Sequence, residues 1–314
     1  MRPNPTSPRP IHTYSIVARD PTTGQLGVAV QSHYFSVGRL VPSAESGVGA
    51  VATQSLVRVD YGPRGLDLMR GGHAAPEVLA RLVAEDDNPD LRQVAMVDAR
   101  GGVAAHTGPR CIPAAGHHVG EAYSVQANMM ESELVWPAMA EAYEAAKGSG
   151  GDLAERLMQA LEAAEAAGGD IRGRQSAAML VVRAESTGRP WEDRVIDLRV
   201  EDHPEPLAEL RRLLRLRRAY DLTDEGDAHL AAGNTDAARD AYGAATAQAP
   251  EVVELAFWAA VALFTSGQRE AALGRFRDVF SREPVWAELV PRLADVGLFP
   301  EDGVAEVVSA SPGT

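Results

Sequence analysis

The last third of the chain repeats itself at a constant spacing, and this repeat restricts the fold of that region more than any other feature. One shift superimposes Gly233 on Gly267, Ala237 on Ala271, Ala238 on Ala272, Tyr242 on Phe276 and Pro250 on Pro284. A small residue suits a point where two helices cross closely, an aromatic ring fills the gap to the next helix, and proline ends a helix. The repeat therefore predicts stacked pairs of helices.

These residue types, at a period of about 34 residues, resemble the tetratricopeptide repeat. The two units span about residues 219–252 and 253–286, and residues 291–298 are expected to add a capping helix. Two repeats are fewer than the three that usually give independent stability, so we expect them to dock on a helix over residues 207–222. Such repeats offer a concave surface to a partner protein, and they also serve as a cap or as an oligomer interface.

Before the repeats, short strand-like segments come in pairs that are separated by turns. Strands are expected at residues 14–18, 26–30, 37–41, 48–53, 93–98, 103–106, 122–126, 176–183 and 195–200. Two alanine-rich segments, 133–147 and 152–167, have helical spacing and are followed by glycine. Hairpins, rather than a regular alternation of strand and helix, favour antiparallel sheets that are covered by helices.

Composition and charge exclude several classes of function. The 30 Lys and Arg residues and 44 Asp and Glu residues give a net charge of −14, which opposes binding to nucleic-acid phosphates and to anionic lipid. The single cysteine, Cys111, excludes an internal disulfide and a CxxC site. The prolines of residues 1–11 predict a disordered tail rather than a secretory signal, and no apolar run is long enough to span a membrane. We therefore expect a cytoplasmic protein.

The common cofactor and metal motifs do not occur in the sequence. It has no GxGxxG after a strand, no GxxxxGK[ST], no HExxH and no GxSxG. His117 and His118 are adjacent, and adjacent side chains on a strand point to opposite faces, so the two cannot easily chelate one ion. We expect no cofactor and no metal. The remaining candidates for chemistry are hydroxyl and amide side chains on short segments.

Such side chains lie in separate blocks that follow one another along the chain, at residues 13–20, 27–32, 47–54, 61–63, 125–129, 169–178 and 197–204. These blocks resemble the domain of unknown function 1028 family, which is placed in the N-terminal-nucleophile (Ntn) hydrolase-like superfamily, and the resemblance covers about residues 12–218. It implies an α+β fold, a four-layer αββα sandwich over residues 12–202. A helical linker and the tetratricopeptide-like repeats follow over residues 203–314.

The resemblance also implies a nucleophile. In that superfamily a Thr, Ser or Cys at the start of a strand begins the mature chain, and its own α-amino group acts as the general base. The corresponding residue is Thr13. Because His12 precedes it, its nitrogen is an amide, so this chemistry requires cleavage between His12 and Thr13 or a translation start other than Met1.

The other site residues are assigned around Thr13. The catalytic candidates are Thr13, Ser32 near the nucleophile, and Asn128 as an oxyanion donor. The candidates for binding substrate are Thr53, Gln54, Gln126, Asp170, Arg172 and Gln175. Asp170 and Arg172 lie two residues apart on a turn, where they either hold a substrate carboxylate or pair with each other to fix the turn.

Three alternatives for function follow. In the first, Thr13 hydrolyses an amide bond of a small or peptide-like substrate. In the second, an inert sandwich presents the helical repeats to a partner protein. In the third, Ser32 or another hydroxyl performs acyl or amide chemistry without processing of the chain. A homodimer is compatible with the sheet edges and the repeat face.

Overall fold

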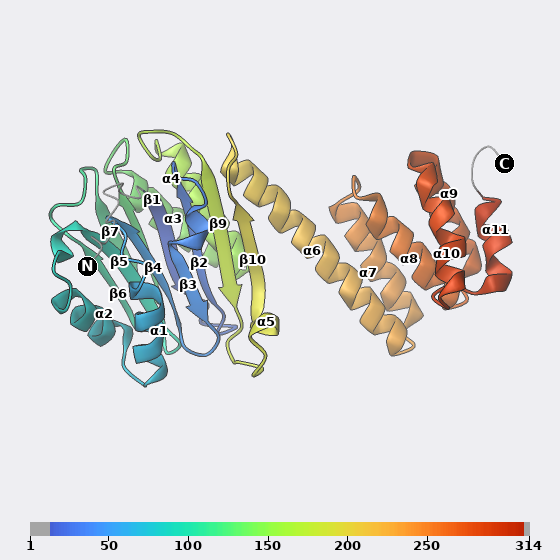
Figure 1. Cartoon of the computed structure of the whole chain (residues 1–314), viewed down its shortest axis with the longest axis horizontal. Helices are drawn as coiled ribbons and strands as arrows, with labels where there is room; N and C mark the ends of the chain where they lie inside the picture. The colour runs from blue at the N-terminus through green and yellow to red at the C-terminus, as the bar shows by residue number, and fades with distance from the viewer. Residues whose placement is uncertain (1–12, 311–314) are drawn as a thin grey trace, which may run out of the picture. The chain divides into compact units, whose positions relative to one another are not determined.

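The computed structural model describes residues 13–310, and the tail expected over residues 1–11 lies outside them. The chain divides into two units, the first ending at Arg211 and the second beginning at Arg212. The first unit is a mixed α/β unit with antiparallel sheets, and the second is helical (Figure 1).

All strand pairings described in the first unit are antiparallel, as the hairpin spacing predicts. The larger sheet has six strands in the order β10-β9-β2-β1-β8-β7, which are Arg194–Val200, Ser176–Val182, Leu26–Ser32, Thr13–Arg19, Tyr123–Asn128 and Gly116–Gly120. The smaller sheet has four strands in the order β3-β4-β5-β6, which are Pro42–Glu45, Gly49–Ser55, Arg92–Asp98 and Val103–Thr107. The first strand, β1, thus lies between β2 and β8.

The two sheets contact each other, and each also carries a pair of helices. Strand β1 contacts β4 and β5, and β8 contacts β5. On the six-stranded sheet, α4 (Leu153–Ala166) packs on β1 and β2, and α3 (Val135–Gly148) packs on β7 and β8. On the four-stranded sheet, α1 (Tyr61–Arg70) packs on β3 and β4, and α2 (Ala75–Ala84) packs on β5 and β6 (Figure 1).

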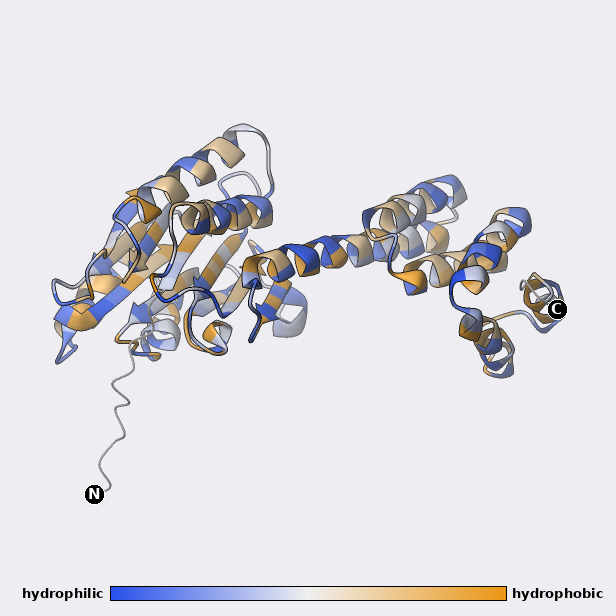
Figure 2. Ribbon diagram, turned by 90° about the horizontal axis from the view of Figure 1, so that it is seen from above, coloured by the Kyte–Doolittle hydropathy of each residue, from blue (hydrophilic) through white to orange (hydrophobic). Residues whose placement is uncertain are grey.

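Side chains alternate along each strand, so one strand contributes to two layers of the core. On β4, Ala50 and Ala52 belong to the cluster between the sheets, whereas Val51 belongs to the cluster under α1 and α2. Figure 2 shows hydrophobic and hydrophilic residues interleaved along the strands. Small residues let the layers approach: a Cβ on Gly27 of β2 would lie 2.7 Å from Leu157 Cδ1 of α4.

The structure differs from the sequence-based expectation in several segments, which include β3 and β7, where no strand was expected. The strand expected at residues 37–41 is wrong: a 3₁₀ turn, η1 (Val37–Arg39), stands there because the Val37 N–H donates to Ser176 Oγ instead of to a strand neighbour. The two adjacent histidines lie on the edge strand β7. The helix expected over residues 207–222 continues further, as α6 (Pro206–Ala231), and so includes the first helix of the repeat. Short turns of helix complete the first unit at η2 (Pro89–Leu91) and α5 (Pro190–Asp193).

The second unit follows the period of the sequence repeat. After α6 come α7 (Thr235–Gln248), α8 (Val253–Thr265), α9 (Arg269–Arg282), η3 (Pro284–Glu288), α10 (Leu289–Asp295), η4 (Glu301–Gly303) and α11 (Val304–Val308). The first and last residues of α7 and α9 are related by the same shift that superimposes Gly233 on Gly267. These two glycines lie in the turns before the helices, with φ of 76° and 87°, a left-handed conformation that favours glycine.

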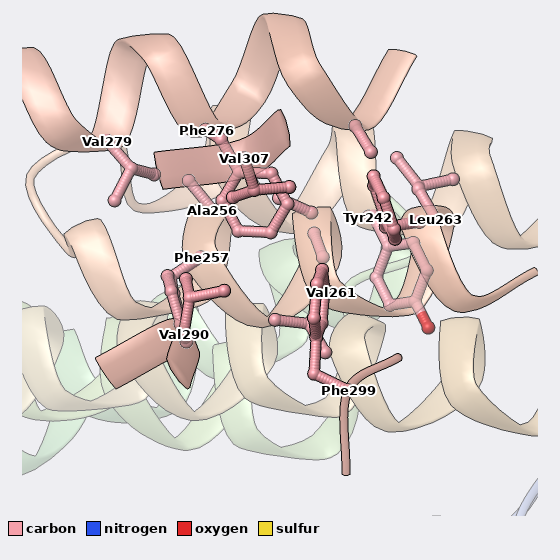
Figure 3. Close-up of a cluster of buried hydrophobic side chains, with 14 of the residues drawn as sticks. Tyr242, Ala256, Phe257, Val261, Leu263, Phe276, Val279, Val290, Phe299 and Val307 are labelled. Atoms are coloured by element: carbon pink, nitrogen blue, oxygen red, sulfur yellow. The ribbon is translucent and has the colours of Figure 1, made fainter. Parts of the chain in front are cut away.

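The residues that repeat form the core of the second unit. Ala238, Ala272, Tyr242 and Phe276 have no exposed surface. The rings of Phe257 and Phe276 meet edge to face, with centroids 5.9 Å apart (Figure 3). Val290 of α10 and Val307 of α11 extend the same cluster. Among the helices of residues 13–310, none has the length and apolar character needed to cross a membrane.

Candidate active site

A cluster of uncharged polar side chains lies between the two sheets. It consists of Ser15 on β1, Gln54 on β4, Gln93 on β5, and Gln126 and Asn128 on β8. All five residues have no exposed surface, and we call them the amide cluster. Period-two alternation explains why they meet, because Thr13 and Ser15 share one face of β1, and Gln126 and Asn128 share one face of β8.

The amide cluster holds the main chain of Thr13. Gln54 Nε2 donates to the Thr13 carbonyl oxygen at 3.1 Å, and Asn128 Nδ2 donates to the same oxygen at 3.4 Å. Both nitrogens also donate to Gln93 Oε1, at 2.7 Å from Gln54 and 2.9 Å from Asn128. Two side chains from different sheets therefore converge on one carbonyl group.

Ser15 connects the remaining members of the amide cluster. Its hydroxyl donates to Gln54 Oε1 at 2.5 Å and accepts from Gln126 Nε2 at 2.6 Å. Ser124 in turn donates to Gln126 Oε1 at 3.0 Å. Buried polar groups stabilise a fold when they are hydrogen-bonded, and a connected network fixes the orientation of each member. The cluster is thus a rigid support at the start of β1.

One histidine borders the amide cluster. Gln93 Nε2 donates to Thr107 Oγ1 at 2.9 Å, and Thr107 Oγ1 lies 2.8 Å from His117 Nδ1. Partial desolvation of the ring, together with nearby His106 and His118, lowers the pKa of His117, although the residue as a whole is exposed. A neutral His117 that accepts from the Thr107 hydroxyl satisfies both contacts, an assignment made from the bonding pattern.

Thr13 has polar neighbours on both sides at the end of β1. It pairs with Ser32 of β2 and with Asn128 of β8. All three residues are buried with no exposed surface. The structure therefore brings together the three catalytic candidates, together with Gln54 and Gln126 from the substrate-binding set.

Asp170 lies just beyond the Thr13 end of β1. It forms an antiparallel bridge with Met130, which follows β8, and its carboxylate accepts a 3.1 Å hydrogen bond from the N–H of His33, which follows β2. Since β8 and β2 are the two neighbours of β1, Asp170 lies across the end of β1 that carries Thr13. Arg172 Nη2 donates to the Asp170 carboxylate at 2.7 Å, and the Asp170 side chain is buried whereas that of Arg172 is 28% exposed.

Two of the substrate-binding candidates lie elsewhere. Thr53 is adjacent to Gln54 on β4 and so points to the opposite face, where its hydroxyl donates to the Arg58 carbonyl oxygen at 3.2 Å. Gln175 donates through Nε2 to Asp202 Oδ1 at 3.1 Å. Asp170 and Arg172 form the ion pair that fixes the turn, which was one of the two alternatives for these residues.

Two members of the amide cluster, Ser15 and Gln93, are not among the site residues expected from the sequence. A signal for Ser15 was available, because it lies two residues after Thr13 on the same strand. Gln93 carried a weaker signal, a polar residue near the start of an otherwise apolar strand. Among residues 13–310, no group of three or more His, Cys, Asp or Glu side chains is placed to hold a metal ion.

Comparisons with known proteins point to one family. Residues 13–210 match the model of a family of unknown function, DUF1028. A protein from Silicibacter pomeroyi, whose crystal structure is described with the same family model, is similar at 31% sequence identity and a TM-score of 0.56. The similarity covers 65% of this chain and 88% of that chain. No curated protein matches the chain.

Proposed function

The chain belongs to the DUF1028 family, whose function is unknown, and we propose that it hydrolyses an amide bond with Thr13 as an N-terminal nucleophile. The substrate class is a small or peptide-like amide. Residues 13–202 then form a four-layer αββα sandwich of the Ntn type. Two facing antiparallel sheets, each with its own helix pair, support this proposal.

The observation that carries the proposal is the environment of Thr13. Thr13 is the first residue of β1, its carbonyl oxygen accepts from two amide side chains, and Asp170 closes the strand end beside it. A threonine chosen only for strand propensity needs none of these partners, since β-branched residues suit any half-buried strand. A support of this kind is what a nucleophile requires, because reacting groups must be held in one geometry.

The chemistry needs a free amine on Thr13. The neutral amine takes the proton of Thr13 Oγ as the oxygen attacks the substrate carbonyl, and the ammonium then gives that proton to the leaving amine. Water, activated by the same amine, hydrolyses the acyl ester and restores Thr13. An α-amino group has a pKa near 8, so it can perform both transfers close to neutral pH.

The hydrogen bonds of Asn128 favour a different role from the one first expected. Its Nδ2 hydrogens are directed to the Thr13 carbonyl oxygen and to Gln93 Oε1. In this proposal Asn128 therefore positions Thr13, and backbone N–H groups near the strand ends stabilise the oxyanion. Arg172 pairs with Asp170 through Nε and Nη2 and fixes the turn, so in this proposal it has no contact with substrate.

Intact mass and covalent labelling test the proposal. The purified chain is weighed to determine whether residues 1–12 are removed, and a chain that begins at Thr13 is treated with a β-lactone. Thr13 Oγ bonds to the lactone carbonyl carbon, the ring C–O bond breaks, and the new hydroxyl receives the Thr13 proton, so the mass rises by that of the whole lactone. Mass spectrometry of peptides locates the adduct.

Three variants make the labelling decisive. Thr13→Ala should abolish the adduct, Thr13→Ser should retain it, and Ser32→Ala should retain it as well. An adduct on Ser32, formed by a chain that keeps residues 1–12, would support the third alternative instead. A chain that begins at Thr13 and neither forms an adduct nor hydrolyses a panel of aryl amides would overturn the proposal.

The second unit supports a further candidate function, capture of a partner protein. Helices α7 and α9 recur at the period of the sequence repeat and bury the same residue types, which supports a tetratricopeptide-like pair of repeats. An open apolar hollow is lined by Val285, Trp286, Glu288, Leu289 and Arg292. Removal of residues 219–314 should leave labelling of Thr13 intact and abolish partner capture; retention of the partner would place its binding site in the first unit.

A further inference from the structure

Gln93, like Gln54, joins the two sheets beside Thr13. It lies on β5, where it pairs with Gln54 of β4 on one side and with Thr107 of β6 on the other. Its side chain reaches across to the six-stranded sheet, where the acceptors of Nε2 are the carbonyl oxygens of Ala127 at 2.8 Å and Gly116 at 3.1 Å; with Thr107 Oγ1 at 2.9 Å, its two hydrogens are shared among three acceptors. One amide group on the smaller sheet therefore bonds to the main chain of two strands, β8 and β7, of the larger sheet.

The orientation of the Gln93 amide is determined by groups that cannot change role. The carbonyl oxygens of Ala127 and Gly116 only accept, so the Gln93 nitrogen must face them. Gln93 Oε1 must then face Gln54 and Asn128, which obliges both of those side chains to present nitrogen rather than oxygen. Those nitrogens are the donors to the Thr13 carbonyl oxygen.

We propose that Gln93 is a positioning residue for Thr13: it holds the amides of Gln54 and Asn128 so that both donate to the Thr13 carbonyl oxygen. This inference rests on the proposed role of Thr13 as the nucleophile. In this scheme Gln93 acts through those two amides rather than on the reacting atoms. Without it, both amides lose an acceptor that only a nitrogen can serve. Gln54 Nε2 keeps the Gln126 carbonyl oxygen at 3.3 Å, so the larger loss of orientation is expected at Asn128, whose amide oxygen would repel the Thr13 carbonyl if it turned toward it.

The test compares Gln93→Met with Gln31→Met. Methionine has nearly the size of glutamine and forms no strong hydrogen bond. Gln31 is the matched control, because it is also a glutamine with no exposed surface, on β2, and within residues 13–310 neither its Nε2 nor its Oε1 has a hydrogen-bond partner. Both variants are made in the chain that begins at Thr13, and the rate of β-lactone labelling is measured against lactone concentration.

The maximal labelling rate and the half-saturating lactone concentration, compared between variants, distinguish a loss of positioning from a general loss of structure. Gln93→Met should lower the maximal labelling rate roughly 10- to 100-fold, as misplacement of a reacting group does, with the half-saturating lactone concentration unchanged. Gln31→Met should leave both values unchanged. Thr107→Val is a second variant for the case that Gln93→Met does not fold; it removes only one acceptor of Gln93 and should give a smaller loss of the maximal rate. A Gln93→Met or Thr107→Val chain that is folded and labels at the wild-type rate would overturn the inference.

A second measurement does not depend on catalysis. With ¹³C-carbonyl threonine, the Thr13 resonance should move upfield in Gln93→Met, because its carbonyl loses hydrogen bonds, and should stay in place in Gln31→Met. An unmoved resonance in folded Gln93→Met would overturn the inference even if Thr13 is labelled. A moved resonance in a protein whose wild type is not labelled would overturn the proposed hydrolysis and leave standing the positioning of the Thr13 carbonyl by Gln93 through Gln54 and Asn128.

Discussion

Replacement of Gln31 by methionine should stabilise the first unit. Gln31 pairs with Tyr14 of β1 and Ala177 of β9, on a face of the sheet where the Tyr14 hydroxyl donates to Glu165 of α4 at 2.5 Å. The Gln31 amide is buried, and within residues 13–310 its nitrogen and oxygen lack hydrogen-bond partners. The folded state thus contains an amide that water would solvate in the unfolded chain.

The size of the effect follows from that burial. A buried amide without partners lowers the stability of a protein by about 1–3 kcal/mol. Methionine fills a similar volume and has no such requirement, so Gln31→Met should raise the free energy of unfolding by about 1–3 kcal/mol. In a unit of this size, 1 kcal/mol shifts the Tm by about 2–4 °C, so the Tm of the first unit should rise by roughly 2–12 °C.

Calorimetry of the full chain measures this shift, with two companion variants as controls. Gln31→Glu should lower the Tm of the first unit at neutral pH, because it buries a charge without a partner. Gln93→Met should lower it too, since it leaves the nitrogens of Gln54 and Asn128 short of an acceptor. A lower Tm in Gln31→Met would refute the reasoning, because it would mean that the Gln31 amide is hydrogen-bonded in solution.

Three further predictions concern charges and turns. Burial by itself raises the pKa of Asp86, but hydrogen bonds from Arg92, from the Asn88 N–H and from Tyr61 outweigh it and lower the pKa to about 2. The folded pKa lies below the unfolded one, so the Asp86 carboxylate adds about 2 kcal/mol to the free energy of unfolding above about pH 4, and this contribution is lost as the pH falls toward about 2. Urea unfolding across that pH range should show a smaller loss of stability in Asp86→Asn than in the wild type. Arg156 Nη2 lies 2.7 Å from Asp20 Oδ2, and the two side chains are only 5% and 6% exposed. Arg156→Met leaves the Asp20 carboxylate buried without this partner, so it should destabilise the first unit by about 3–5 kcal/mol. Adding Asp20→Asn should recover part of that loss in the same unfolding assay. In the second unit, Gly233→Ala should lower stability by about 1 kcal/mol because φ is positive there, whereas Gly274→Ala in helix α9 should raise it by about 0.5–1 kcal/mol; equal effects on the Tm would contradict the assigned turn.

Local periodicity was enough to predict much of the fold. The hairpin spacing predicted antiparallel sheets, and the period of the C-terminal repeat predicted the positions of α7 and α9. The strand expected at residues 37–41 was wrong because Val37 bonds to Ser176, which lies 139 residues further along the chain. A hydrogen bond of that separation has no trace in a short window of sequence.

For the candidate site, the sequence alone singled out Thr13, Gln126 and Asn128 and predicted strands at residues 14–18 and 122–126. In the structure the two strands reach Thr13 and Asn128, so the side-chain period of two places Gln126 and Asn128 on one face. Only the tertiary structure decided that Gln54 and Gln93 lie against them and that Asp170 closes the strand end. The physical reason is the separation along the chain of the residues that each property depends on. Alternation along a strand is a property of neighbouring residues, whereas the packing of one sheet on another depends on the whole core between them.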